Sequence, residues 1–499
     1  MIALLLCAAA GASVLLEQEL EGIVIGRPNP LNGQPSVNYR THDLDRDGLQ
    51  DILLPNRILL QRSGEFPHAL SVALPHATRH TEYDVFGGML YLRSSGLLEI
   101  HLLEGMTWKR VLRQNIAWPD IEPDAEDAPS AGDAAKQDGK LGHFLYDLFG
   151  NGVPEIVVPG ADGLYVYANP GLGYTSIQVL DVYARPKIVF PAHAPLWPPE
   201  ARTVSYPSNR LRFRLVLDED SISIFSRSAG PDDLVQHHIS RWRFDRELGY
   251  RPRADSPPAH TLGPLPAFLQ PSRLNQDEIP DFAGVRRYFT KTSPVPEPIR
   301  EIVATTDGGR TLQSFRSKSF QTLCAFLDFD GDGDLDAIVE STNLYQGGLK
   351  EFLTRSMSKR TLRHTLHIHL QDEHGRFSTA PDLRHTVSIK LLHPPFRNGP
   401  LFTEYQNGGL FNLTGDLNGD GKRDLVARTH PDRLSIYLNE NLAFPKTPDR
   451  TLAIPRDARF AVADIDGDGR SDIVIYGSEA LESGGVERAL IHFSRTAGP

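Results

Sequence analysis

A short acidic motif occurs four times along the chain, and its side chains are of the kind that bind metal ions. Each copy has aspartate or asparagine at positions 1, 3 and 5, glycine at position 6 and aspartate at position 9. The copies begin at Asp43, Asp328, Asp416 and Asp464. Oxygens at positions 1, 3 and 5 of a tight loop converge on one point, and glycine at position 6 permits the sharp turn. The spacing therefore predicts a cation site in each copy.

The ligand chemistry predicts Ca²⁺, at about four sites. Calcium prefers oxygen ligands at about 2.3–2.6 Å, whereas zinc prefers cysteine and histidine, which the motif lacks. Without a cation, carboxylates held about 4–6 Å apart raise one another's pKa. The predicted ligands, including the backbone carbonyl of position 7, are Asp43, Asp45, Asp47, Leu49, Asp51, Asp328, Asp330, Asp332, Asp334, Asp336, Asp416, Asn418, Asp420, Lys422, Asp424, Asp464, Asp466, Asp468, Arg470 and Asp472.

The residues after each motif distinguish it from a helical calcium-binding hand. That loop needs a bidentate glutamate at position 12. The residues at position 12 here are Leu54, Val339, Ala427 and Ile475. A short run rich in Ile, Val and Leu follows position 9 each time, which is typical of a buried strand. A single acidic turn is a common feature of loops, but four copies with the same position 9 indicate a repeated site.

The motifs and the strands that follow them resemble the FG-GAP/VCBS repeats of integrin-type β-propellers. In those repeats each blade carries Asp-x-Asp-x-Asp-Gly-x-x-Asp between two strands. The resemblance extends from about residue 38 to the end of the chain. It implies an all-β protein, a β-propeller of seven or eight four-stranded blades with the calcium loops on one face. Eight units are countable along the chain, but the fourth, at residues 183–262, is divergent, so seven blades remain an alternative.

Two further copies depart from the motif. The first begins at Asp147 and has Phe149 at position 3 and Glu155 at position 9. The second begins at Arg273 and has Glu278 in place of the glycine. Because ligands are missing from both, we expect these loops to keep the shape of the turn without holding calcium well.

Other segments define the limits of the domain. Residues 1–12 resemble a secretory signal peptide, with an apolar core and small residues at its end, although a basic start is lacking. Residues 13–499 are expected to form a single propeller, with a flexible acidic loop at residues 119–139. The loosely alternating segment Val14–Gly26 is expected to supply a strand that closes the ring with the C-terminus.

Composition limits the partners and the location of the protein. A formal net charge of -11 argues against binding to nucleic acid. No stretch beyond the first twelve residues is long and apolar enough to span a bilayer. If the signal peptide is removed, Cys324 is the only cysteine, and no internal disulfide can form. We therefore expect a monomer that is secreted, periplasmic or at the cell surface and is stabilised by calcium.

Long insertions indicate where a partner would bind. Six of them fall between units or between the second and third strands of a unit, which places them on the face opposite the calcium loops. They are residues 119–139, 186–207, 254–265, 287–299, 341–360 and 476–486. Long loops on a rigid frame commonly carry binding functions, and the resemblance implies ligand binding on the same face. We therefore expect a non-catalytic module that binds protein or glycan, as in cell adhesion.

A carbohydrate-active enzyme such as a polysaccharide lyase, using that same face, is the alternative. No short catalytic motif is present, so no catalytic residue is assigned. Residues 349–360 have apolar side chains at helical spacing and a basic opposite side, which predicts a helix that covers the end of the propeller or contacts an acidic partner. His364, His367 and His369 favour a plain strand over a metal site because no carboxylate has a suitable offset.

Overall fold

The computed structural model describes the repeats residue by residue and divides them into two compact units. One unit is formed by residues 38–267, and the other by residues 1–37 together with residues 268–499. The described residues are 13–21, 25–28, 35–37, 39–62, 65–75, 81–94, 96–118, 140–141, 144–147, 151–159, 164–169, 174–180, 214–218, 221–229, 234–245, 249–252, 260–266, 269–272, 274–275, 281–289, 298–306, 310–317, 326–342, 361–390, 410–456, 458–477 and 488–496.

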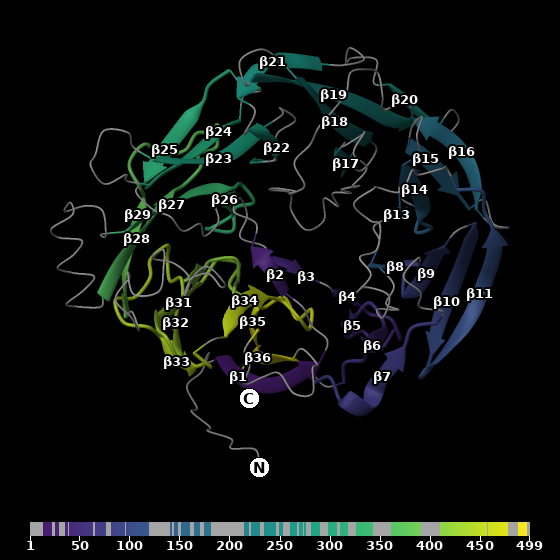
Figure 1. Ribbon diagram of the computed structural model, residues 1–499, viewed down its shortest axis with the longest axis horizontal. Coiled ribbons are helices and arrows are strands. Elements are labelled where there is room, and N and C mark those ends of the chain that lie inside the picture. Colours follow the sequence, from purple (N-terminus) through teal and green to yellow (C-terminus); the bar gives the residue numbers. More distant parts are fainter. Residues whose placement is uncertain are drawn as a thin grey trace. The chain divides into compact units, whose positions relative to one another are not determined.

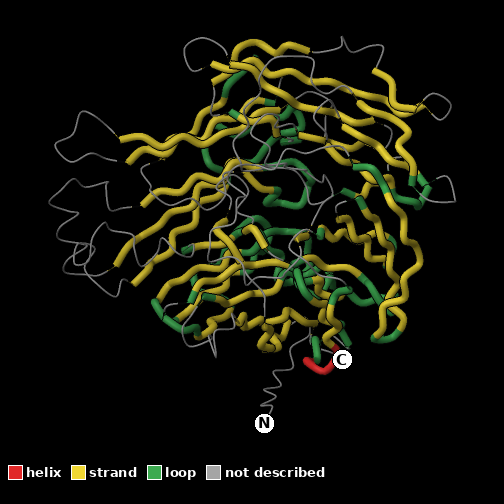
Figure 2. The backbone as a smooth tube through the Cα atoms, turned by 45° about the vertical axis from the view of Figure 1, so that its right-hand side comes forward, coloured by secondary structure: helices red, strands yellow, loops and turns green. Residues whose placement is uncertain are grey.

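Most of these residues lie in β-strands, and the others form the turns and loops that connect them (Figures 1 and 2). Within them, the only helical element is a single 3-10 turn, η1 (His68–Leu70). No helix in the described ranges has the length and apolar character needed to cross a membrane. The all-β class expected from the sequence is confirmed.

The unit of residues 38–267 contains four successive sheets, in which each main strand pairs antiparallel with the next one along the chain. The first sheet consists of β4 (Arg40–His42), β5 (Asp51–Leu53), β6 (Arg57–Leu59) and β7 (Ser71–Ala73). The second consists of β8 (Glu82–Phe86), β9 (Met89–Ser94), β10 (Leu97–Glu104) and β11 (Thr107–Asn115), and β12 (Lys140–Leu141) pairs parallel to β8 at its edge.

The third and fourth sheets of this unit follow the same meander, with one extra strand in the fourth, because β21 also pairs with β19. The third sheet consists of β13 (Leu145–Tyr146), β14 (Glu155–Pro159), β15 (Leu164–Ala168) and β16 (Thr175–Leu180). The fourth consists of β17 (Arg214–Asp218), β18 (Ser221–Ala229), β19 (Leu234–Asp245), β20 (Gly249–Pro252) and β21 (His260–Pro266).

The other unit also contains four sheets of four strands, and a two-stranded ribbon of β2 (Ile25–Pro28) and β3 (Pro35–Val37). The first of these sheets consists of β22 (Gln270–Ser272), β23 (Asp281–Phe289), β24 (Pro298–Thr305) and β25 (Gln313–Ser317). The second consists of β26 (Phe326–Leu327), β27 (Asp336–Thr342), β28 (Thr361–His369) and β29 (Leu383–Lys390). The third consists of β30 (Phe411–Asn412), β31 (Leu425–His430), β32 (Arg433–Tyr437) and β33 (Arg450–Ala453).

The last sheet joins the two ends of the described chain. It consists of β34 (Arg459–Ala463), β35 (Asp472–Tyr476), β36 (Arg488–Thr496) and, at its edge, β1 (Ser13–Glu21). β1 runs antiparallel to β36, with Ser13 opposite Thr496 and Glu21 opposite Arg488. The expected pairing of the N-terminal segment with the C-terminus is therefore confirmed, although the paired strand is the first part of that segment and not its second.

The buried core lies between neighbouring sheets, and each core cluster draws on two of them. Leu53 and Ile58 of one sheet share a cluster with Val85 and Leu90 of the next. In the other unit, Ile338 and Leu366 of one sheet lie in a cluster with Leu425, Tyr437 and Phe444 from the segment that forms the next. A repeat of this kind buries little apolar surface alone and depends on its neighbours for stability.

The strand pattern confirms the predicted repeat, with eight sheets of four or five strands among the described residues. The sheet in the divergent segment continues to Pro266, beyond the expected limit at residue 262. Four predictions lie outside the described residues: the signal peptide at residues 1–12, the acidic loop at 119–139, the insertion at 186–207 and the helix at 349–360. Closure of the sheets into a ring stays a prediction.

Candidate metal centre

All four acidic loops occupy the same place in their sheets. Each one joins the first strand to the second, as the sequence predicts: β4 to β5, β26 to β27, β30 to β31 and β34 to β35. Position 2 of each loop is an apolar residue that is almost fully buried, and position 9 is the first residue of the second strand or directly precedes it. The loop therefore starts and ends on residues that the core holds in place.

The position-9 aspartate binds two backbone amides that are far apart in the sequence. Asp336 Oδ2 accepts the amide of Phe329 at 2.9 Å, and its Oδ1 accepts the amide of Gln371 at 2.8 Å. The same two contacts recur in the other loops, from Asp51 to Leu44 and Gln61, from Asp424 to Leu417 and Asn439, and from Asp472 to Ile465 and Ser494. This carboxylate ties the loop to the far end of the third strand.

Carboxylates at positions 1 and 5 hold the turn itself. Asp47 Oδ1 accepts the amide of Leu49 at 2.9 Å, and Asp43 Oδ2 accepts the amide of Gly48 at 3.1 Å. Gly48 has a φ of 89°, a conformation that favours glycine. Equivalent contacts of position 5 are made by Asp332, Asp420 and Asp468. These bonds use one oxygen of each side chain and leave the other directed elsewhere.

Carboxylate oxygens converge in three of the four loops. In each group the candidate ligand atoms lie within 4.8 Å of one another, and the groups are Asp43, Asp45 and Asp51; Asp328, Asp330 and Asp332; and Asp464, Asp466 and Asp472. In the first group, Asp43 Oδ1 and Asp45 Oδ1 are buried and have no hydrogen-bond partner. Buried acceptors without partners are costly, so this donor set fits a hard divalent cation such as Ca²⁺.

Burial makes these carboxyl groups harder to ionise in the absence of a cation. Desolvation is the largest cause, and it outweighs the backbone hydrogen bonds that act in the opposite direction. It raises the pKa of Asp51 to about 6, that of Asp424 to about 7, and those of Asp336 and Asp472 to about 8. Neighbouring carboxylates of the same loops raise these pKa values further. A cation at this position would remove the penalty on the ionised forms.

The third loop differs from the other three. Three backbone amides, those of Gly419, Asp420 and Gly421, donate to the two oxygens of Asp416. Asn418 stands at position 3 and donates to Asp420 Oδ2 at 3.2 Å. Among the described residues, this loop does not bring three carboxylate oxygens together. Its predicted ligands thus include one neutral amide and a carboxylate already engaged by the backbone.

Neighbouring loops of the same unit are joined by backbone hydrogen bonds. The amide at position 8 donates to the preceding loop: Leu335 to the carbonyl of Leu274 at 2.7 Å, Arg423 to that of Phe329 at 3.2 Å and Ser471 to that of Asp416 at 2.6 Å. Four successive loops of this unit therefore form one series, which agrees with their predicted position on a common face.

Close packing between two of these loops gives a prediction. A Cβ atom at Gly331, where φ is 83°, would lie 2.7 Å from the carbonyl oxygen of Gly421, whereas Gly48 has a similar φ and open space around it. Gly331→Ala should lower the free energy of unfolding by about 3 kcal/mol, and Gly48→Ala by about 1–2 kcal/mol. Urea unfolding of metal-free protein measures both values, and equal losses would contradict the predicted clash.

Comparison with known families identifies the repeat. A sequence profile described as "FG-GAP-like repeat" matches residues 416–475, which contain the loops that begin at Asp416 and Asp464. The chain is an FG-GAP-repeat protein. The match lies on two of the strong motifs, and the other two share their spacing and the contacts of position 9.

Other comparisons add little about this FG-GAP-repeat protein. Hsv2 of Kluyveromyces lactis is similar over 75% of this chain and 98% of its own, at 12% identity and a TM-score of 0.18. A second Kluyveromyces lactis structure, "Hsv2 complete loop 6CD", covers the same shares at 10% identity and a TM-score of 0.17. Scores this low support no conclusion about fold or function. A search of curated proteins found no match.

The weak loops of the FG-GAP protein keep parts of the turn. Asp147 accepts the amides of Asn151 and Gly152, both at 2.9 Å, as the first residue of a strong loop does. Asp281, at position 9 of the other weak loop, accepts the amide of Leu274 at 2.6 Å. These contacts are therefore retained where ligands are missing, and the absence of calcium from these loops stays a prediction.

The three histidines lie on β28, which confirms the predicted strand. His364 and His369 are buried, and His367 is half-buried. Burial lowers the pKa of His364 to about 3, and neither of its ring nitrogens has a hydrogen-bond partner. His367 lies 3.1 Å from Ser341 Oγ, and His369 lies 2.8 Å from the carbonyl of Ser378. Each ring thus has its own surroundings, and no metal group among the described residues includes them.

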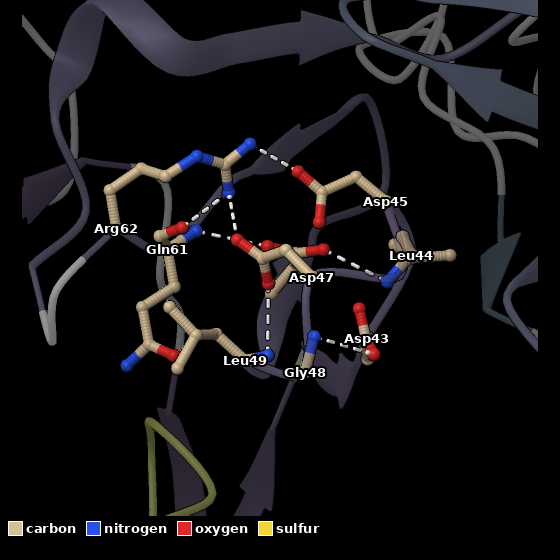
Figure 3. A network of polar contacts seen from close by, with 9 residues as sticks. Asp43, Leu44, Asp45, Asp47, Gly48, Leu49, Gln61 and Arg62 are labelled. Carbon is tan, nitrogen blue, oxygen red and sulfur yellow. Dashed lines mark hydrogen bonds and ion pairs between the residues drawn. The ribbon is translucent and has the colours of Figure 1, made fainter.

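The sequence did not predict one residue that contacts the first loop. Arg62 follows the third strand of its sheet, and its guanidinium contacts two predicted ligands, Asp45 and Asp47 (Figure 3). Neither spacing nor motif indicates this contact, because Arg62 lies 17 residues from Asp45. The only available signal was its place directly after Gln61, whose amide binds Asp51.

Proposed function

We propose that the protein is a calcium-stabilised, exported β-propeller that acts as a non-catalytic interaction module for a protein or a glycan. The observation that carries the proposal is the convergence of carboxylate oxygens within 4.8 Å in three loops at the same place in their sheets. FG-GAP repeats typically occur in extracellular proteins, where calcium is abundant and can serve as a structural staple.

Calcium would be held by oxygens that the fold already positions. In the first loop these are the unpartnered Oδ1 atoms of Asp43 and Asp45 together with Asp51. In the second they come from Asp328, Asp330 and Asp332, on the residues between β26 and β27. A bound ion supplies two positive charges to the clustered carboxylates, and so relieves the desolvation of the ionised forms.

The role as an interaction module follows from the rigid frame. Sheets that are stapled by position-9 carboxylates and joined loop to loop give a scaffold of low mobility. On such a scaffold the long insertions would be available for a partner, on the face opposite the acidic loops. Incubation with a panel of plant and bacterial polysaccharides should yield no cleavage products, and a glycan array with a pull-down from the exported proteome should yield binding. Cleavage of any polysaccharide would contradict the proposal.

The calcium sites are tested by metal content. Asp332→Ala removes a predicted ligand whose Oδ1 also caps its turn, so this variant should bind one calcium ion fewer than the wild type. Asp372→Ala is a matched control, because Asp372 is an exposed aspartate of the same sheet that also caps a turn. Equilibrium dialysis and elemental analysis would count the ions. Equal content in the three proteins would refute the assignment of Asp332, and no calcium in the wild type would refute the proposal.

A further inference from the structure

The guanidinium of Arg62 occupies part of the first acidic loop. Its Nη1 lies 2.8 Å from Asp47 Oδ2, and its Nη2 contacts Asp45 Oδ2 (Figure 3). The planar arginine head group is suited to binding two carboxylates at once. The Arg62 side chain is 40% exposed, while that of Asp45 is only 6% exposed. Arg62 therefore reaches the ligands from the solvent side.

The contact takes oxygens that a calcium ion would use. Positions 3 and 5 of the motif are predicted ligands, and in this loop both are paired with the same cation. Asp43 Oδ1 and Asp45 Oδ1 stay buried without hydrogen-bond partners, so the loop retains acceptors for a second cation. Calcium affinity in oxygen-ligand loops depends on the number of ligand charges and on the freedom of the ligands to move. Arg62 reduces both.

The corresponding position differs in the second and third loops. Arg62 directly follows the residue whose amide donates to the position-9 aspartate. By the same criterion, the second loop has Asp372 and the third has Glu440 at this position. Neither residue can bring a positive charge to the ligands. In the fourth loop the position is Arg495, whose side chain lies outside the described part of the chain.

We propose that Arg62 competes with calcium for the first loop, so that this loop fills at a higher calcium concentration than the loop that begins at Asp328. The inference rests on the proposed function, since it requires that both loops bind calcium. Arg62 then pairs with Asp45 and Asp47 in the absence of calcium and lowers the calcium affinity of the first loop. The first loop would respond to changes in free calcium over a range in which the second is already occupied.

Calcium titration by calorimetry tests the competition in the full chain. Arg62→Gln removes the charge and keeps a polar side chain, so the binding step of the first loop should tighten by about ten-fold or more, the factor expected from the loss of a charged hydrogen bond to a ligand. Asp43→Ala identifies the step that belongs to the first loop, because that step should disappear.

Two further variants separate competition from general electrostatics and from loss of the fold. Arg46→Gln removes an equal charge from the same loop, but Arg46 contacts the carbonyl of Gly87 and no carboxylate among the described residues, so the step should change by less than about three-fold at physiological salt. Arg62→Lys keeps the charge but loses the planar fork, and its step should fall between those of the wild type and Arg62→Gln.

The outcomes distinguish the inference from the proposed function. If Arg62→Gln and Arg62→Lys both titrate like the wild type while calcium still binds elsewhere, the competition is refuted and the proposed function stands. An equal gain in Arg46→Gln and Arg62→Gln would also refute it, because charge alone would explain the effect. If the wild type binds no calcium, both proposals fail. Circular dichroism of each variant confirms that the titrated protein is folded.

Discussion

Removal of calcium should destabilise the protein far more at pH 8 than at pH 5. Each occupied site stabilises the fold by RT ln(1 + [Ca²⁺]/Kd), which is about 3–4 kcal/mol at 100 to 1,000 times Kd. With three converging carboxylate groups, the loss on removal should be the largest effect available in this protein. Thermal unfolding of metal-stripped and calcium-loaded protein at both pH values would measure the difference.

The pH dependence follows from the buried position-9 carboxyl groups. In the metal-free fold their pKa values are raised, to about 6 for Asp51 and about 8 for Asp336, above the value of about 3.9 in an unfolded chain. The folded state therefore binds more protons than the unfolded state between pH 4 and pH 8. Where the folded state binds more protons, stability falls as pH rises, so the metal-free protein should lose stability across this window.

Calcium should reverse this trend, because ionised carboxylates are its ligands. Binding then releases protons, and the apparent affinity should increase from pH 5 to pH 8. Protons released on calcium addition can be counted in weakly buffered solution. Identical unfolding curves with and without metal at pH 8 would contradict the calcium proposal, and a metal-free protein whose stability rises with pH would contradict the raised pKa values.

Asp336→Ala should cost about 3–5 kcal/mol of stability even in the absence of metal. The two oxygens of Asp336 accept the amides of Phe329 and Gln371, and the side chain is 1% exposed. A buried donor that loses its partner costs about 1–3 kcal/mol, and the alanine variant would leave both buried amides without a partner. Urea unfolding in metal-free buffer measures the loss apart from any calcium effect.

An asparagine at this position should be nearly as harmful. Asp336→Asn can accept only one of the two amides, and its own amide group would face the other donor, so a loss of about 2–4 kcal/mol is expected. Asp332→Asn serves as the control, because it removes the same charge from the exposed part of the same loop and keeps an acceptor for the amide of Asp334. Equal losses in both asparagine variants would show that charge, and not the double contact, determines stability.

Much of the repeat could be predicted from the sequence because its signals are local. The motif that begins at Asp328 specifies its own turn: position 5 caps position 7 with a contact two residues away. The strand after the loop is short, apolar and bounded by turn residues, so its limits can also be predicted from the sequence. The same reasoning predicted that the loosely alternating N-terminal segment pairs with the C-terminus, but not which part of it forms β1.

The second role of position 9 could not be predicted in this way. Sequence spacing assigns Asp336 to a metal, and the structure gives it two amides, one of them 35 residues away on Gln371. The contact depends on how the third strand returns past the loop. Arg62 is a similar case, since a charged residue after a strand has no preferred partner until the sheet has formed.

By itself, the amino-acid sequence determined the all-β class, the repeat and the positions of the acidic turns, because hydrophobic periodicity and turn chemistry act within about ten residues. Only the tertiary structure decided which oxygens of those turns converge, which are engaged by distant amides and which are paired with Arg62. Those choices depend on strand pairing and burial between sheets, where residues far apart in the chain are brought into contact and separated from water.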